Sequence, residues 1–181
     1  IIDGDSVNIN SGGAIKFVDS LIGNANVEIK GLGGNDTFTF TALWRSKTMK
    51  IDGSTEGNNK ANLEAIKNDM IIRVNASGEI TKVDLFNISK IVPVSTLNVL
   101  KVQDLAGSQS KDVTLDISAY TAIGLIYTIK SFSGGNDVVI TNKATNALIL
   151  PVHNITHIVG SNTKDDTFKY LSGATLTGTI D

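Results

Sequence analysis

A glycine-rich turn that ends in a carboxylate is the segment of this chain best suited to chemistry. Residues 31–36 read GLGGND, and an alternating pattern, TFTF, follows at once. Glycines give a tight turn access to positive φ, which points peptide oxygens inward, and an aspartate adds a hard anionic oxygen beside them. The turn therefore predicts a Ca²⁺ site with Asp36 as a ligand and with Gly31 and Gly34 shaping the backbone. The alternative is a plain glycine turn whose aspartate caps its own backbone.

A complete calcium site needs about six to eight oxygens, so a neighbouring segment must contribute ligands to this turn. Asp19 and Asp52 are the nearest carboxylates that could do so. Two partial copies of the turn predict further ligands. Asp137 lies in GGNDVV at 134–139, and Asp165 and Asp166 lie in SNTKDDTF at 161–168, where a lysine replaces the second glycine.

The chain also repeats itself over longer distances. The tripeptide DTF occurs at 36–38 and again at 166–168, and the dipeptide ID follows each copy, at 51–52 and 180–181. A second echo relates NISKIV at 87–92 to NITHIV at 154–159, with a fainter copy in NVEIK at 26–30. These echoes predict degenerate repeats of about 62–67 residues within a single segment, 1–181. Repeated units that cannot bury their own apolar faces favour a stack of similar coils.

Short apolar alternations with turn residues between them predict an all-β chain. They occur at Val7/Ile9, Val27/Ile29, Val83/Leu85, Leu97/Val99, Val113/Leu115/Ile117 and Ile123/Leu125. Only 58–67 has spacing that suggests a helical turn. A parallel β-solenoid is favoured because two-residue Asn-Gly or Asp-Gly hairpin turns between apolar strands are missing. An antiparallel β-sandwich is the alternative, since it too contains many short strands.

Composition limits the classes of function. The chain has 181 residues, 41% of them hydrophobic, a net charge of −2 and no cysteine, so disulfides and zinc–thiolate sites are excluded. The basic residues are scattered, which argues against nucleic acid as a partner. No apolar run is long enough for a membrane span, and no signal-peptide pattern precedes the first strand. The abrupt start and the end within a motif suggest a fragment of a longer protein.

Two sets of residues need separate interpretation. His153 and His157 would share one face of a helix as a metal pair, but this segment has a strand pattern, which favours two separate surface or turn histidines. Five aromatic residues, Phe38, Phe40, Trp44, Tyr120 and Tyr127, could form a sugar-stacking platform, although aromatic residues on strands more often pack the core. No nucleophile–base constellation is visible, so the sequence predicts no catalysis.

In its turns, the chain resembles the calcium-binding repeats of secreted RTX proteins, the GGxGxD-type repeats of large bacterial adhesins and calcium-dependent surface-layer proteins. The resemblance implies a parallel β-roll with calcium between turns, type I secretion, and an extracellular or cell-surface location. It also implies neighbouring domains or copies of the same surface protein as partners. The expected function is a non-catalytic structural segment stabilised by calcium. The alternative is a carbohydrate-binding or glycan-processing β-helix domain that contacts cell-surface glycans.

Overall fold

The computed structural model describes residues 6–9, 13–16, 26–44, 48–87, 92–122, 124–132, 135–162 and 165–181. These residues form strands and turns, and none of them forms a helix that could cross a membrane. The strands are β1 (Ser6–Ile9), β2 (Gly13–Lys16), β3 (Asn26–Lys30), β4 (Thr37–Thr39), β5 (Thr48–Asp52), β6 (Lys60–Asn62), β7 (Asp69–Val74), β8 (Ile80–Phe86), β9 (Pro93–Leu100), β10 (Asp104–Ala106), β11 (Val113–Asp116), β12 (Leu125–Phe132), β13 (Gly135–Asn142), β14 (Leu148–His153), β15 (His157–Val159) and β16 (Thr167–Tyr170). The all-β prediction is confirmed.

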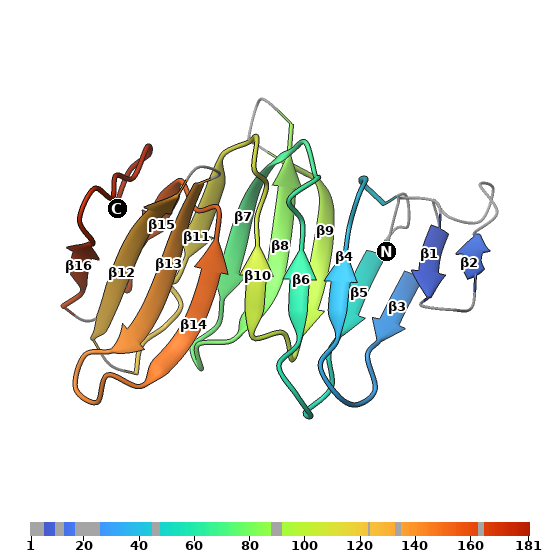
Figure 1. The fold of residues 1–181 in the computed structure, drawn as a ribbon, viewed down its shortest axis with the longest axis horizontal. Helices are drawn as coiled ribbons and strands as arrows, with labels where there is room; N and C mark the ends of the chain where they lie inside the picture. Colours follow the sequence, from blue (N-terminus) through green and yellow to red (C-terminus); the bar gives the residue numbers. More distant parts are fainter. Residues whose placement is uncertain are drawn as a thin grey trace.

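Two mixed sheets of seven strands face each other across one core (Figure 1). Sheet I has the order β16-β12-β13-β14-β10-β6-β4, and sheet II has the order β15-β11-β7-β8-β9-β5-β3. A separate antiparallel pair, β1 and β2, precedes them. Neither seven-stranded sheet closes on itself, so the arrangement resembles a β-sandwich. The two sheets end at β4 and β3 on one side, where β1 and β2 lie beside β3, and at β16 and β15 on the other (Figure 1).

The strands form where apolar residues alternate with polar ones. In β7, Met70, Ile72 and Val74 are buried, while the residues between them are partly exposed. A similar alternation in β5, β11 and β14 directs apolar side chains of both sheets into a single cluster. Burial of one face by this alternation also fixes the register, since a slip of one residue would turn every apolar side chain outward.

The chain crosses repeatedly between the two sheets. Within each sheet, strands from successive crossings pair in parallel. In sheet II, β3 pairs with β5 and β5 with β9; in sheet I, β4 pairs with β6 and β6 with β10. Further parallel pairs are β7 with β11, β10 with β14, β11 with β15 and β12 with β16. Each crossing between sheets therefore returns the chain to a strand of the same direction.

Two antiparallel meanders interrupt this pattern, one in each sheet. The strands β7, β8 and β9 form the meander of sheet II, and β12, β13 and β14 form that of sheet I. The sequence argument against hairpins is thus wrong. The turn between β7 and β8 lacks an Asn-Gly pair, but the Asn75 side chain accepts hydrogen bonds from the Ser77 and Glu79 amides and Gly78 has φ +86°.

The predicted helical turn at 58–67 is also wrong, because Lys60–Asn62 is strand β6, which lies between β4 and β10 in sheet I. Its central residue, Ala61, is buried between Phe38 on β4 and Leu105 on β10. A strand of three residues is too short to show a period of two. Pairing with both neighbours therefore decides its conformation.

The repeated DTF and ID motifs occupy corresponding places. Each DTF motif leads into a strand of sheet I, β4 or β16. In sheet II, Ile29 is opposite Ile51, and Ile158 is opposite Ile180. The glycine that follows the first strand donates in both copies to the last aspartate of the motif, Gly31 N to Asp52 O at 2.8 Å and Gly160 N to Asp181 O at 2.9 Å.

The echo between 87–92 and 154–159 has a different structural context. Asn87 follows β8, whereas Asn154 follows β14, and residues 88–91 lie outside the described part of the chain. The two meanders give another recurrence, in which β7 to β11 are followed by β12 to β16 with the roles of the two sheets exchanged.

Candidate functional site

The turn between β3 and β4 folds its terminal carboxylate back over its first glycine. Leu32 and Gly34 take positive φ, +69° and +97°, and these bends carry Asp36 onto Gly31. A Cβ added to Gly31 would overlap the Asp36 carboxylate, so a larger residue at position 31 would force the Asp36 side chain to move. Asp36 Oδ2 is buried and has no hydrogen-bond partner among the described residues. A buried carboxylate oxygen without a donor is costly unless a cation approaches it.

The turn between β5 and β6 stacks directly on this turn and repeats its backbone. Ser54 and Gly57 take φ +66° and +82°, which matches Leu32 and Gly34. Asn58 N donates to Asn35 Oδ1 at 2.8 Å, and Gly57 lies against the Gly34 peptide oxygen. The two turns thus form successive layers of one edge of the molecule.

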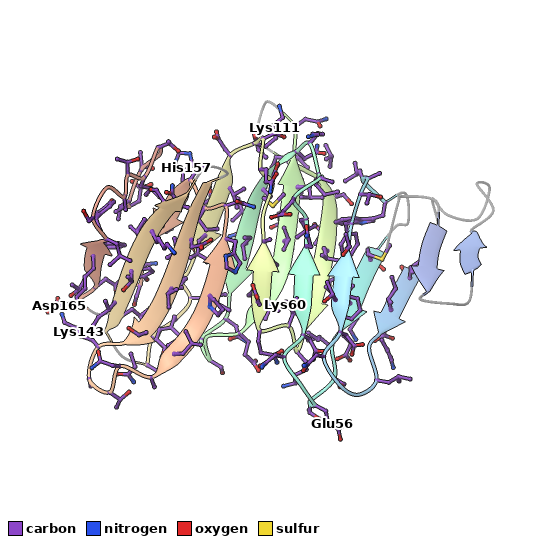
Figure 2. The ribbon with its side chains drawn as sticks, in the orientation of Figure 1. Glu56, Lys60, Lys111, Lys143, His157 and Asp165 are labelled. Atoms are coloured by element: carbon purple, nitrogen blue, oxygen red, sulfur yellow. The ribbon has the colours of Figure 1, made fainter. Side chains whose placement is uncertain are left out.

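The second turn brings a further carboxylate beside the first turn. A Cβ added to Gly33 would lie 2.9 Å from Glu56 Oε2, which places the Glu56 carboxylate beside the first turn. Figure 2 shows Glu56 at the tip of the second turn. Together with Asp36 and the Gly34 peptide oxygen, Glu56 offers the hard oxygen chemistry that Ca²⁺ takes. Sequence reasoning missed Glu56. Alignment of the second turn, GSTEGNN, with GLGGND would have placed it next to Gly57 as the counterpart of Gly33.

The second turn carries an amide where the first carries the carboxylate. Asn59 is fully buried, and its Nδ2 donates to the Gly53 and Lys101 peptide oxygens. The Asn59 side-chain oxygen, Oδ1, accepts a hydrogen bond from Asp36 N at 2.9 Å. The backbone N–H of Asn59 donates to Gln103 Oε1 at 2.8 Å. Side-chain hydrogen bonds therefore join three successive turns. The side-chain amide of Asn59 finds all its hydrogen-bond partners within the protein.

The matching turn at the other end of the molecule has a satisfied carboxylate. Asp166 lies over Gly160, as Asp36 lies over Gly31. Asp166 accepts from Ser161 N at 2.7 Å, Leu125 N at 3.2 Å and the Tyr127 hydroxyl at 3.3 Å. Burial, together with the Asp166 charge, raises the pKa of Tyr127, so the phenol remains a donor. Two carboxylates that look alike in sequence thus differ in the number of hydrogen-bond donors around them.

The remaining predicted ligands lie in several different settings. Asp52 Oδ1 accepts a hydrogen bond from Ser54 N at 3.1 Å. Asp165 is exposed, and its peptide oxygen lies 3.4 Å from Lys143 Nζ. Figure 2 shows Asp165 and Lys143 near each other. Asp137 lies within strand β13, so the GGNDVV match is not a corner turn. Asp19 lies outside the described residues. Across the described ranges, no three His, Asp or Glu side chains are grouped as a metal site.

His153 forms the most extensive ionic contact on the outer face of sheet I. Its Nε2 lies 2.9 Å from Asp104 Oδ1 and its Nδ1 lies 2.6 Å from Asp137 Oδ1, while Lys60 contacts Asp104 at 2.9 Å. Lys60 lies on β6, the strand between β4 and β10 (Figure 2). The two carboxylates raise the pKa of His153 to about 9, and Asp104 makes the larger contribution. The contact with His153 in turn lowers the pKa of Asp104. Because both ring nitrogens are engaged, this group acts as an ion-pair clasp across strands.

His157 begins β15 in the other sheet, so the two histidines do not form a metal pair. Its Nδ1 accepts a hydrogen bond from Thr179 N at 3.0 Å, which ties the chain after β16 to β15. The interpretation of two separate histidines agrees with this placement, although both are partly buried and bonded within the fold.

Sheet II carries a comparable group that sequence reasoning also missed. Asp84 is 2% exposed on β8 and accepts from Arg73 Nε, Lys82 Nζ and Thr96 Oγ1 at 2.8–2.9 Å. Burial alone would raise the pKa of Asp84, but these donors outweigh it and the pKa is lowered. Arg73 also contacts Asp116 at 2.6 Å. The group links four neighbouring strands and leaves no carboxylate oxygen without a donor.

The five aromatic residues considered for sugar stacking are all buried, with exposed fractions of 7% or less. Phe40 packs on Trp44 with ring centroids 5.3 Å apart, and Tyr127 stacks on Phe168 at 4.6 Å. The core interpretation of these residues is confirmed. They offer no platform to a glycan.

No family model matches this sequence, and no curated protein or solved structure is detectably similar to it.

Proposed function

We propose that this chain is a non-catalytic structural segment of a bacterial cell-surface protein, of the adhesin or surface-layer kind, stabilised by calcium outside the cell. The observation that carries the proposal is the pair of stacked glycine turns in which Asp36 Oδ2 is buried without a donor. No described aromatic platform favours the glycan-binding alternative, so it is not developed.

The topology supports a β-solenoid architecture within this proposal. Strands that belong to successive crossings pair in parallel in both sheets, and turns from successive crossings stack at one edge. Each meander then adds two antiparallel strands to one sheet, along the direction in which the layers stack. Such a stack is extended and rigid, since each layer contacts mainly its neighbours, and this suits a spacer or wall element.

The residues of the first two turns fit a calcium ion in part. Asp36 and Glu56 would supply carboxylate oxygens, and the Gly34 peptide oxygen lies between the same two turns. Asn35 Oδ1 is already used by Asn58 N. Bound calcium would neutralise the Asp36 carboxylate and hold the two layers together.

Thermal unfolding with calcium and with chelator tests the proposal. An ion that binds only the folded state adds RT ln(1 + [L]/Kd), about 2.7 kcal/mol at a hundredfold excess over Kd. For a domain of this size, that gain corresponds to a rise in Tm of roughly 5–10 °C. Equal melting temperatures with calcium and with chelator would contradict the calcium part of the proposal.

A matched pair of variants makes the test residue-specific. Asp36→Asn removes one unit of ligand charge, so the calcium-dependent rise in Tm should be lost while Tm in chelator stays nearly unchanged. Asp166→Asn is the control, because protein donors already satisfy Asp166. The control should lower Tm by the same amount with and without calcium. If calorimetry gives Asp36→Asn the calcium affinity of the parent, Asp36 is not a ligand.

A further inference from the structure

We propose that Asn75 is a site of N-linked glycosylation, at which the side-chain amide receives a sugar from a phosphate-activated donor. The inference builds on the proposed cell-surface role, because it assigns a modification to an exposed turn of such a segment. It requires no calcium, so its failure and the failure of the calcium proposal are distinguishable.

Four segments of the chain carry the acceptor pattern Asn-x-Ser/Thr, in which x is any residue but proline. They read NDT at 35–37, NAS at 75–77, NIS at 87–89 and NIT at 154–156. Short patterns of this kind also arise by chance, so the surroundings of each asparagine decide whether a transferase can reach it. Residues 88–91 lie outside the described part of the chain, which leaves three copies to compare.

The NIT copy is inaccessible. Asn154 is 2% exposed, and its Nδ2 donates to the Gly107 peptide oxygen at 3.0 Å. Thr156 Oγ1 accepts from Val113 N at 2.8 Å and donates to Val113 O at 3.1 Å. Both the amide and the hydroxyl of this copy are therefore engaged within the fold.

The NDT copy is part of the stacked turns. Asn35 Oδ1 accepts from Asn58 N at 2.8 Å, and Asp36 N donates to the buried Asn59 side chain at 2.9 Å. Thr37 then begins β4. A transferase must draw its acceptor segment into its own active site, and here that movement would break bonds to the next layer.

The NAS copy lies in the turn between β7 and β8, which is bonded mainly to itself. Asn75 N donates to Glu79 O at 2.9 Å, and Gly78 N donates to Asn75 O at 3.0 Å. Ala76 and Ser77 are exposed. Such a turn can open locally without disturbing another layer, which suits an acceptor of a bulky, solvated group.

The side chain of Asn75 presents its nitrogen to the outside of this turn. Oδ1 accepts from Ser77 N at 2.9 Å and from Glu79 N at 3.0 Å, which turns the amide oxygen toward the backbone. Nδ2 donates one hydrogen to the exposed Glu79 carboxylate at 3.1 Å, and no acceptor among the described residues takes the other. The inner side of the turn is anchored, because buried Gly78 lies against Ile149.

The transfer balances with these groups. Asn75 Nδ2 forms a bond to the anomeric carbon of the sugar, the bond from that carbon to the phosphate oxygen breaks, and the phosphate leaves with the electron pair. Nδ2 loses one proton, and Glu79 already accepts a hydrogen bond from this nitrogen. The contact with Asn75 and the nearby Lys101 charge lower the pKa of Glu79, so its carboxylate is ionised at neutral pH. A carboxylate on the amide N–H raises the electron density of the nitrogen and favours its attack.

Mass spectrometry of the protein isolated from the cells that make it tests the assignment. Peptides that contain Asn75 should carry a sugar mass, and electron-transfer fragmentation should place it on Asn75 rather than on Ser77. Peptides that contain Asn154 should be unmodified. An unmodified Asn75, or a sugar on Asn35 or Ser77 in its place, overturns the proposal.

Ser77 offers a matched pair of variants, made in the same cells. Ser77→Ala removes the hydroxyl of the acceptor pattern but keeps the N–H that donates to Asn75 Oδ1. The glycosylated fraction of Asn75 should therefore fall about tenfold or more, while thermal unfolding shows that the fold is retained. Ser77→Thr keeps the hydroxyl and should retain the modification. An equal glycosylated fraction in Ser77→Ala and the parent would contradict recognition of this pattern and overturn the assignment.

Discussion

His153 should make the stability of this protein depend on pH in the alkaline range. The ring lies between Asp104 on β10 and Asp137 on β13 and donates one N–H to each when charged. The substitution His153→Gln removes the charge but keeps hydrogen-bonding groups at the same place. It therefore separates the ionic contribution from simple loss of contact.

The magnitude follows from the shift in pKa. The pKa of His153 is raised from 6.5 to about 9, a difference of 2.5 units, and each unit corresponds to about 1.36 kcal/mol, or about 3.4 kcal/mol in all. The His153 side chain is 34% exposed, and solvent screening reduces such contributions, so about 1–2 kcal/mol is expected. Since the folded-state pKa is the higher one, the contribution is fully present below pH 6.5. It is lost as the pH rises through 9.

Urea unfolding at pH 6 and at pH 9.5 measures this contribution. Between these pH values, the free energy of unfolding should fall by about 1–2 kcal/mol more for the parent than for His153→Gln. His157→Gln is the matched control, because the His157 ring accepts a hydrogen bond from Thr179 N, and it should keep the pH dependence of the parent. If His153→Gln also keeps that dependence, the two carboxylates do not hold a charged imidazole.

Two further substitutions probe the layers themselves. Asn59→Ala should lower the free energy of unfolding by about 1–3 kcal/mol, because the Gly53 and Lys101 peptide oxygens lose a donor, whereas exposed Asn58→Ala should change it by less than about 0.5 kcal/mol; chemical denaturation compares the two. Phe38→Ala should cost about 3–5 kcal/mol by cavity formation, and Phe168→Ala clearly less, because Phe168 is only partly buried; equal losses in denaturation midpoints would refute this difference.

Much of the strand content could be predicted from local alternation. The patterns at Val83/Leu85, Leu97/Val99 and Val113/Leu115 correspond to β8, β9 and β11, because a half-buried strand leaves a period of two in its sequence. Strands of three residues such as β6 and β10 leave no period, so only their pairing defines them. The meander turns were missed because asparagine side chains at Asn75 and Asn142 bond the turn amides in place of an Asn-Gly pair.

The site shows the same limit more sharply. The DTF repeat related the segments that contain Asp36 and Asp166, and in the structure each of these carboxylates lies over a glycine. It could not distinguish them, because the difference lies in the neighbouring strand of sheet I. Tyr127 is opposite Phe168 and donates to Asp166, whereas Ala61 is opposite Phe38 and has no side-chain donor. Residues about 25 to 40 positions away in the chain thus decide which carboxylate is left without a partner.

Because each sheet contains one meander, the two sheets, which form the two walls of the molecule, have the same number of strands and the same width across their strands. Neighbouring strands lie about 4.8 Å apart, so the two extra strands of one meander widen its wall by nearly 10 Å. With a meander in sheet II alone, the opposite wall would be narrower by that amount and the stack would have to curve or leave core residues uncovered. Because the two sheets exchange roles in the second half, each sheet has seven strands and this mismatch between the sheets does not arise.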